Sequence, residues 1–181
     1  LELKPNYADA HNNLGIALKE LGNIKSAIKC FTKALELQPI QADTLYNLGN
    51  ALKELGDLNS AINSFQKAIR LRSAFPKAYN NLGTVLQEQG DLDSAINSFQ
   101  KAIQINPNYP EAHSNLGNAL QAQGKLKEAI DCCRTSIKLN SNYPEAYINL
   151  GVALKEQGDL NSAINSFQKA IQINPNYPEA H

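Results

Sequence analysis

The tripeptide Asn13-Leu14-Gly15 returns four more times along the chain, always after 34 residues. The later copies are Asn47-Leu48-Gly49, Asn81-Leu82-Gly83, Asn115-Leu116-Gly117 and Asn149-Leu150-Gly151. A second glycine stands seven residues after the glycine of each copy. These second glycines are Gly22, Gly56, Gly90, Gly124 and Gly158. Together, the two sets account for all 10 glycines of the 181-residue chain. A fixed period without an insertion predicts one supersecondary unit stacked several times.

We divide the chain into five repeats, the first of which begins at Ala8. They span residues 8–41, 42–75, 76–109, 110–143 and 144–177. Residues 1–7 are expected to be the end of a preceding repeat, and residues 178–181 the start of a sixth. Stacked repeats share one continuous core, so we expect residues 1–181 to form a single domain. The chain does not begin with Met, which indicates a fragment of a longer parent.

Each repeat contains two segments with helical periodicity. In the first segment, apolar residues follow the i, i+3, i+4, i+7 spacing of one buried helix face, as at Leu14, Ala17, Leu18 and Leu21. The second segment, residues 24–35 in the first repeat, has the same spacing. Strand alternation is absent, so the sequence predicts an all-α fold of helix pairs.

Residues with known positional preferences mark the helix boundaries. Proline is tolerated in the first turn of a helix, which predicts first helices that begin at Pro76, Pro110 and Pro144. The second glycine of each repeat suits the left-handed residue that ends a helix, and three second helices have an N-cap aspartate after it: Asp57, Asp91 and Asp159. Proline should stop the second helices at Pro39, Pro107 and Pro175. Where Ser73 and Ser141 replace it, we expect the helix to run further.

The glycine of Asn-Leu-Gly falls inside the first helix, where it costs about 1 kcal/mol relative to alanine. A close approach of the two helices would explain why glycine is kept in every repeat despite this cost. We expect a column of small residues on the second helix to pack opposite: Ala27, Ala61, Ala95, Ala129 and Ala163.

At this point the chain resembles a known family, because Leu14-Gly15, Ala27, Phe31, Ala34 and Pro39 match the tetratricopeptide repeat signature. The resemblance covers essentially the whole chain. It implies an α-solenoid, a right-handed superhelix whose first helices line a concave groove and whose second helices lie outside. Cys133 and Ser136 replace the signature Phe and Ala in repeat four, so its second helix is expected to be the weakest-packed.

Composition excludes several classes of function. Lys+Arg and Asp+Glu both number 17, so the formal net charge is zero and nothing favours nucleic acid or an anionic membrane surface as a partner. No apolar run approaches the roughly 18 residues of a membrane span, and no signal peptide is visible. The three cysteines, Cys30, Cys132 and Cys133, do not form a disulfide framework, which indicates a reducing, cytoplasmic location.

No catalytic constellation is present, and we expect neither a cofactor nor a metal. The histidines His11, His113 and His181 share one repeat column, which favours a packing role. The adjacent cysteines lack the Cys-x-x-Cys spacing of a metal or redox pair. We therefore predict that the chain is not an enzyme, although it could be a non-catalytic part of one.

The asparagine ladder, which we define as Asn13, Asn47, Asn81, Asn115 and Asn149, is the strongest candidate for function. Asparagine is a poor helix former, so helix propensity does not explain it. Its amide is both donor and acceptor, which suits binding of an extended peptide backbone. The alternative is that each asparagine bonds to the neighbouring repeat and sets the stacking angle.

The predicted peptide-binding residues are the ladder and its neighbours on the first helices. The neighbours are Asn12, Tyr46, Asn50, Lys77, Asn80, Thr84 and Asn118. The main hypothesis is a scaffold that binds extended peptide or protein segments in the groove. The ladder also resembles the repeat arm of O-linked N-acetylglucosamine transferases, as do residues 47–54 and 102–107, which implies a substrate-recognition arm of a larger glycosyltransferase as an alternative.

The third hypothesis is a structural or self-assembling module. Repeat arrays need polar ends, but residues 1–7 are too short to cover Leu14 and Leu18. At the other end, Ile164, Phe167 and Ile171 form an apolar stripe that residues 178–181 are too few to cover. We therefore predict end-to-end self-association.

Overall fold

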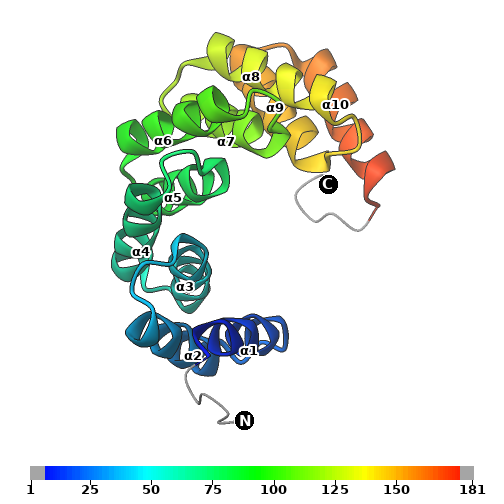
Figure 1. The fold of residues 1–181 in the computed structure, drawn as a ribbon. Coiled ribbons are helices and arrows are strands. Elements are labelled where there is room, and N and C mark those ends of the chain that lie inside the picture. The colour runs from blue at the N-terminus through cyan, green and yellow to red at the C-terminus, as the bar shows by residue number, and fades with distance from the viewer. Residues whose placement is uncertain (1–6, 176–181) are drawn as a thin grey trace. The chain divides into compact units, whose positions relative to one another are not determined.

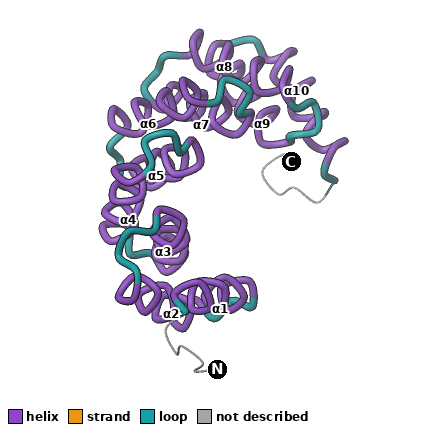
Figure 2. Tube along the Cα trace, in the orientation of Figure 1, coloured by secondary structure: helices purple, strands orange, loops and turns teal. Residues whose placement is uncertain are grey.

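The computed structural model describes residues 7–175, and all regular secondary structure in that range is α-helical (Figures 1 and 2). The all-α prediction is confirmed. The expected preceding repeat and sixth repeat fall almost entirely on residues 1–6 and 176–181, outside the described range, as does His181. The helices are α1 (Ala8–Glu20), α2 (Ile24–Leu37), α3 (Ala42–Leu55), α4 (Leu58–Leu71), α5 (Pro76–Glu88), α6 (Leu92–Ile105), α7 (Pro110–Ala122), α8 (Leu126–Leu139), α9 (Pro144–Gln157) and α10 (Leu160–Ile173).

The chain divides into two compact units, Leu1–Val85 and Leu86–His181. In the first unit, Phe31 and Phe65 are fully buried between paired helices. A further cluster around Leu45 and Phe75 joins α3, α4 and the start of α5. In the second unit, one apolar cluster runs from Ala95 to Ala163 through every helix pair.

The predicted helix starts are confirmed. α5, α7 and α9 begin at their prolines. The carboxylates of the three N-cap aspartates each accept a hydrogen bond of 3.1 Å from a serine N–H three residues on, as from Ser60 to Asp57. Hydrogen bonding to that serine, through its side chain and its backbone, lowers the pKa of each aspartate below its usual value. Asn23 occupies the same position before α2 without a side-chain cap.

The second glycine of each repeat adopts the predicted left-handed conformation, with φ between 76° and 95°. At the end of α3, the N–H of Gly56 donates to the Lys53 carbonyl at 2.9 Å. The next N–H, that of Asp57, reaches back to the Leu52 carbonyl at 2.9 Å. These bonds satisfy carbonyls that the helix end would otherwise leave unpaired.

The prediction that α4 and α8 run further than their counterparts is wrong. The second helices all end at the same repeat position, with or without a following proline. The residue after each helix is extended, with φ −136° and ψ 93° at Arg72 and φ −142° and ψ 99° at Asn140. The backbone has therefore left the helix before it reaches Ser73 or Ser141, so proline follows this helix end and does not cause it.

The mid-helix glycine allows a close approach of the second helix, and at Gly15, Gly49 and Gly151 the nearest atoms belong to a phenylalanine ring. A Cβ atom on Gly15 would lie 2.6 Å from Cε1 of Phe31, and one on Gly151 would lie equally close to Phe167. The phenylalanine stands one turn beyond the alanine column on the second helix, and its ring lies against the glycine. At Gly117, where a cysteine replaces the phenylalanine, a Cβ would lie 2.7 Å from Sγ of Cys133 and 3.1 Å from the Ala129 carbonyl oxygen.

Candidate functional site: the polar face of the first helices

The predicted binding residues of the first unit lie on α1, α3 and residues 76–85 of α5, which we call the first-helix face of that unit. Hydrogen bonds join several of them across repeats. The Nδ2 atom of Asn47 on α3 donates to Oδ1 of Asn12 on α1 at 3.0 Å. The Nδ2 atom of Asn81 on α5 donates to Oδ1 of Asn50 at 2.7 Å and to the Tyr46 hydroxyl at 3.2 Å.

The second unit has a corresponding first-helix face on α7 and α9. Asn149 Nδ2 on α9 donates to the hydroxyl oxygen of the buried Ser114 on α7 at 3.0 Å. Asn118, also on α7, donates to Oδ1 of Asn149 at 3.4 Å. The Oδ1 atom of Asn118 in turn accepts a hydrogen bond from Gln87 near the end of α5.

These bonds follow one rule. Asn47, Asn81 and Asn149 each bond to the residue 35 positions earlier, and Asn81 and Asn149 also bond to the residue 31 positions earlier. Both positions belong to the first helix of the preceding repeat. Three ladder asparagines therefore link neighbouring repeats, the second of the two roles that the sequence left open.

The inter-repeat bonds leave part of the asparagine amides unused. Asn47 makes one side-chain hydrogen bond, through Nδ2. Asn13 is exposed on α1, and its side chain makes no hydrogen bond to any residue in the range 7–175. An amide has two N–H donors and an oxygen with two lone pairs, so both side chains retain donors and acceptors.

The remaining predicted residues have different positions. Asn80 is buried and its Nδ2 donates to Asn81 at 3.3 Å, while the Thr84 hydroxyl donates to the Asn80 carbonyl at 3.1 Å within α5. Lys77 is exposed at the start of α5, and Asn115 is half-buried in α7. Asn80 thus contacts the ladder residue Asn81, whereas Thr84 is half-buried and bonds within its own helix.

A second set of inter-repeat links lies at the end of the first helices, and we did not predict it. Lys19 lies 3.7 Å from a carboxylate oxygen of Glu54, and Gln121 donates to Glu156 at 2.6 Å. The two pairs occupy equivalent repeat positions, 35 residues apart in each case. That spacing, shared with the ladder bonds, is the signal that could have revealed them.

Two of the cysteines are largely buried, and His113 bonds to the backbone. Burial raises the pKa of the Cys132 thiol to about 11, with the charges of Asp131 and Glu128 adding to it, and burial raises that of Cys133 to about 12. Both thiols are therefore protonated at neutral pH and are poor nucleophiles. His113 hydrogen-bonds through Nε2 to the Pro107 carbonyl at 2.9 Å. Among residues 7–175, no three His, Cys, Asp or Glu side chains group as metal ligands would.

Helix pairs of constant length, with a glycine under a phenylalanine ring in most pairs, define a class of helical-repeat proteins. Family models match this chain throughout its length: a TPR repeat model matches residues 49–90, 85–124 and 117–158, and tetratricopeptide repeat models match residues 8–40, 30–63 and 144–177. The chain belongs to the tetratricopeptide repeat family.

Several solved structures share the fold. A crystal structure of MamA protein is 27% identical, covers 93% of this chain and 92% of its own, and has a TM-score of 0.79. YrrB, described as a TPR protein with an unusual peptide-binding site, is 27% identical over 99% of this chain and 92% of its own, with a TM-score of 0.76. PilF of Pseudomonas aeruginosa, at 24% identity and a TM-score of 0.85, covers 96% of this chain and 79% of its own and shows the fold alone.

A comparison with curated proteins gives no matching relative. Within residues 7–175, no helix has both the length and the apolar character needed to cross a membrane.

Proposed function

We propose that this chain is a non-catalytic scaffold that binds extended peptide or protein segments on the first-helix faces of its repeats. The observation that carries the proposal is the row of amide side chains held in fixed positions by inter-repeat hydrogen bonds. A side chain that is already ordered loses little conformational entropy when a ligand binds, so such a row favours binding even where each contact is weak.

The chemistry of the row suits a peptide backbone. An extended peptide presents N–H and C=O groups along both edges, and asparagine amides can pair with either. Among residues 7–175, Asn47 keeps one N–H and its oxygen available, and Asn13, which no inter-repeat bond holds, keeps its whole amide. Hydrogen bonds to the peptide backbone do not depend on the side chains of the ligand, so we expect modest affinity and broad sequence tolerance.

YrrB supports the proposal, because it is described as having a peptide-binding site and its similarity extends over 99% of this chain.

The two roles of the ladder can be separated with two variants. Asn13→Ala removes a side chain without hydrogen bonds to the described residues, so it should weaken peptide binding severalfold with an unchanged melting temperature. Asn81→Ala removes the bonds to Asn50 and Tyr46 and the bond from Asn80, so it should reduce both binding and stability, at about 1 kcal/mol per lost hydrogen bond.

The measurement is fluorescence anisotropy with peptides selected from a displayed random library, with circular dichroism melts of each variant. A severalfold loss in Asn13→Ala at full stability supports the proposal. Wild-type affinity in Asn13→Ala, together with only a stability loss in Asn81→Ala, would restrict the ladder to stacking and contradict it.

A further inference from the structure

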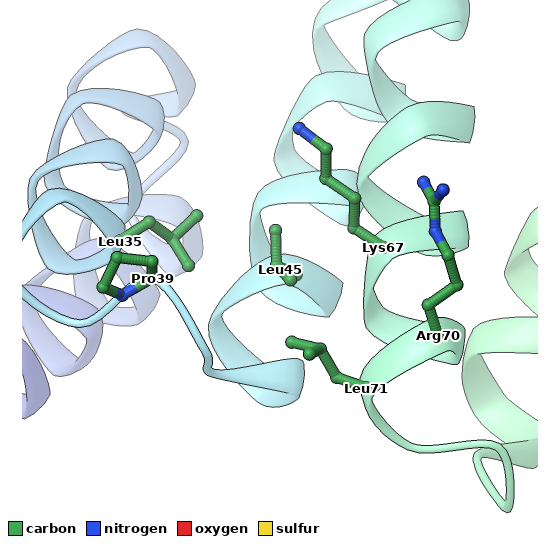
Figure 3. Close-up of a pocket in the computed structure, with 6 residues that line it drawn as sticks. All are labelled: Leu35, Pro39, Leu45, Lys67, Arg70 and Leu71. Carbon is green, nitrogen blue, oxygen red and sulfur yellow. The ribbon is translucent and has the colours of Figure 1, made fainter.

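A pocket of about 370 Å³ lies in the first unit between the second helices α2 and α4 (Figure 3). Leu35 of α2, Pro39 of the following loop, Leu45 of α3 and Leu71 of α4 give it an apolar floor and walls. Leu71 is 44% exposed although it is apolar. Two cations of α4, Lys67 and Arg70, complete the lining, and Figure 3 shows Lys67 extending from α4 above Leu45.

The equivalent pocket of the second unit has a different chemistry. It measures about 620 Å³ and lies 102 residues further along the chain, between the α8–α9 loop, α9 and α10. Ser141 stands in the place of Pro39, Tyr147 in the place of Leu45, and Gln172 in the place of Arg70. The repeat pattern therefore does not require the apolar and cationic character of the first pocket.

The lysine in this pocket also lacks the partner that its counterparts have. Lys33 bonds to Glu36 at 2.9 Å, and Lys101 and Lys169 bond to Gln104 and Gln172 at 3.0 Å, always three residues on.

In α4 the residue three positions after Lys67 is Arg70, a second cation. Within residues 7–175 neither side chain forms an ion pair. Like charges at this helix spacing destabilise a helix slightly, and a bound anion would remove that cost.

We propose that this pocket binds an acidic peptide segment of a partner protein. A leucine- or phenylalanine-sized side chain enters between Leu35, Leu45 and Leu71, and flanking carboxylates pair with Lys67 and Arg70. The apolar lining favours a ligand with a large apolar side chain. Lys67 and Arg70, which form no ion pair within residues 7–175, favour acidic residues beside that side chain. This site is separate from the first-helix face, and the inference does not depend on the function proposed for that face.

The test uses a fluorescein-labelled peptide of sequence GSEDLFEDGS and measures its anisotropy on the full chain. Two control peptides separate the contributions: GSQNLFQNGS lacks the carboxylates, and GSEDAAEDGS lacks the anchor. We expect each control to bind at least tenfold more weakly, and the affinity for the acidic peptide to fall as salt is raised from about 50 to about 300 mM.

Variants that copy residues of the second pocket provide the matched controls. Leu45→Tyr and Arg70→Gln introduce the residues found at 147 and 172, so both should fold normally and weaken binding about tenfold. Grafting the first pocket onto the second, with Ser141→Pro, Tyr147→Leu and Gln172→Arg in the Leu45→Tyr and Arg70→Gln background, should restore binding.

Three results would overturn the proposal. The first is no detectable binding of the acidic peptide at millimolar protein. The second is equal affinity for the three peptides, which would assign the binding to the sequence-tolerant first-helix face or to non-specific adsorption and not to this pocket. The third is wild-type affinity in both Leu45→Tyr and Arg70→Gln variants whose melting curves show them to be folded.

Discussion

The ring of Phe65 occupies the space that a side chain on Gly49 would need. A Cβ atom at Gly49 would lie 2.7 Å from Cε1 of Phe65 and 2.8 Å from its Cδ1. The same contact recurs at Gly15 with Phe31 and at Gly151 with Phe167. Glycine is therefore needed here because the phenylalanine ring leaves no room for a side chain. Its conformational freedom is of no use inside a helix.

Gly49→Ala should destabilise the first unit. Overpacking a tight core site costs about 1–3 kcal/mol, and the gain in helix propensity of about 1 kcal/mol offsets part of it. In a Phe65→Ala background the ring is absent, so the same substitution should raise the free energy of unfolding. Urea denaturation of the four proteins of this double-mutant cycle measures the coupling. An equal loss in both backgrounds would mean that the glycine is needed for another reason.

Cys133→Phe should raise thermal stability. Cys133 is buried beside Gly117, in the place that phenylalanine fills in other repeats, and its side chain is smaller than a phenylalanine ring. If the larger side chain adds about 1 kcal/mol to the free energy of unfolding, the melting temperature should rise by roughly 2–4 °C in a chain of this size. Differential scanning calorimetry measures the shift. A lower melting temperature would show that repeat four has repacked around the smaller residue.

Asn23→Asp should stabilise α2. Asn23 makes no side-chain cap, yet Ser26 follows it as Ser60 follows Asp57, so an aspartate can accept the same N–H. The pKa of the existing cap aspartates is lowered by bonding to serine. Their stabilising effect is therefore complete above pH 3.8, the usual aspartate pKa, and is lost as pH falls through the lowered value.

The gain in melting temperature of Asn23→Asp should follow the same pH dependence, and Asn23→Ala should change little. Thermal melts between about pH 7 and about pH 2.5 provide the measurement. A gain that persists at the lowest pH would show that the carboxylate is not acting as a charged cap.

Exposed apolar residues on α1 and α10 should promote self-association of the 181-residue chain. Leu14 is 50% exposed on α1, and Ile164 is 53% exposed on α10. Pairing such surfaces removes apolar area from water, and a head-to-tail contact can continue without closing. Sedimentation velocity over a hundredfold concentration range should show larger species, which Ile164→Lys should reduce. A strict monomer throughout would rule out this association.

The repeat period allowed most of the fold to be predicted, because five copies of one pattern reinforce each helix boundary. The error at Ser73 and Ser141 arose because proline was treated as the cause of a helix end that an extended residue already produces. The Phe31 contact with Gly15 was missed because spacing alone does not show which of two buried columns lies against a glycine.

The candidate site was harder to predict. The ladder positions were identifiable from their spacing, but the hydrogen bonds from Asn81 to Asn50 and Tyr46 depend on how adjacent repeats stack, which no single repeat determines. The cations Lys67 and Arg70, which form no ion pair within residues 7–175, could have been found by comparing repeats, because only α4 places a second cation three residues after this lysine.

The most direct test of the central claim is to map a bound peptide by the side-chain amide signals of asparagine in two-dimensional ¹H–¹⁵N spectra. The peptide is one selected from the random library, and substitutions assign each amide pair. We expect the largest shifts at Asn13, Asn12 and Asn47 on the first-helix face, with small shifts at Asn59 and Asn63 on α4. Shifts confined to second-helix asparagines, or none at saturating peptide, would contradict the proposed binding face.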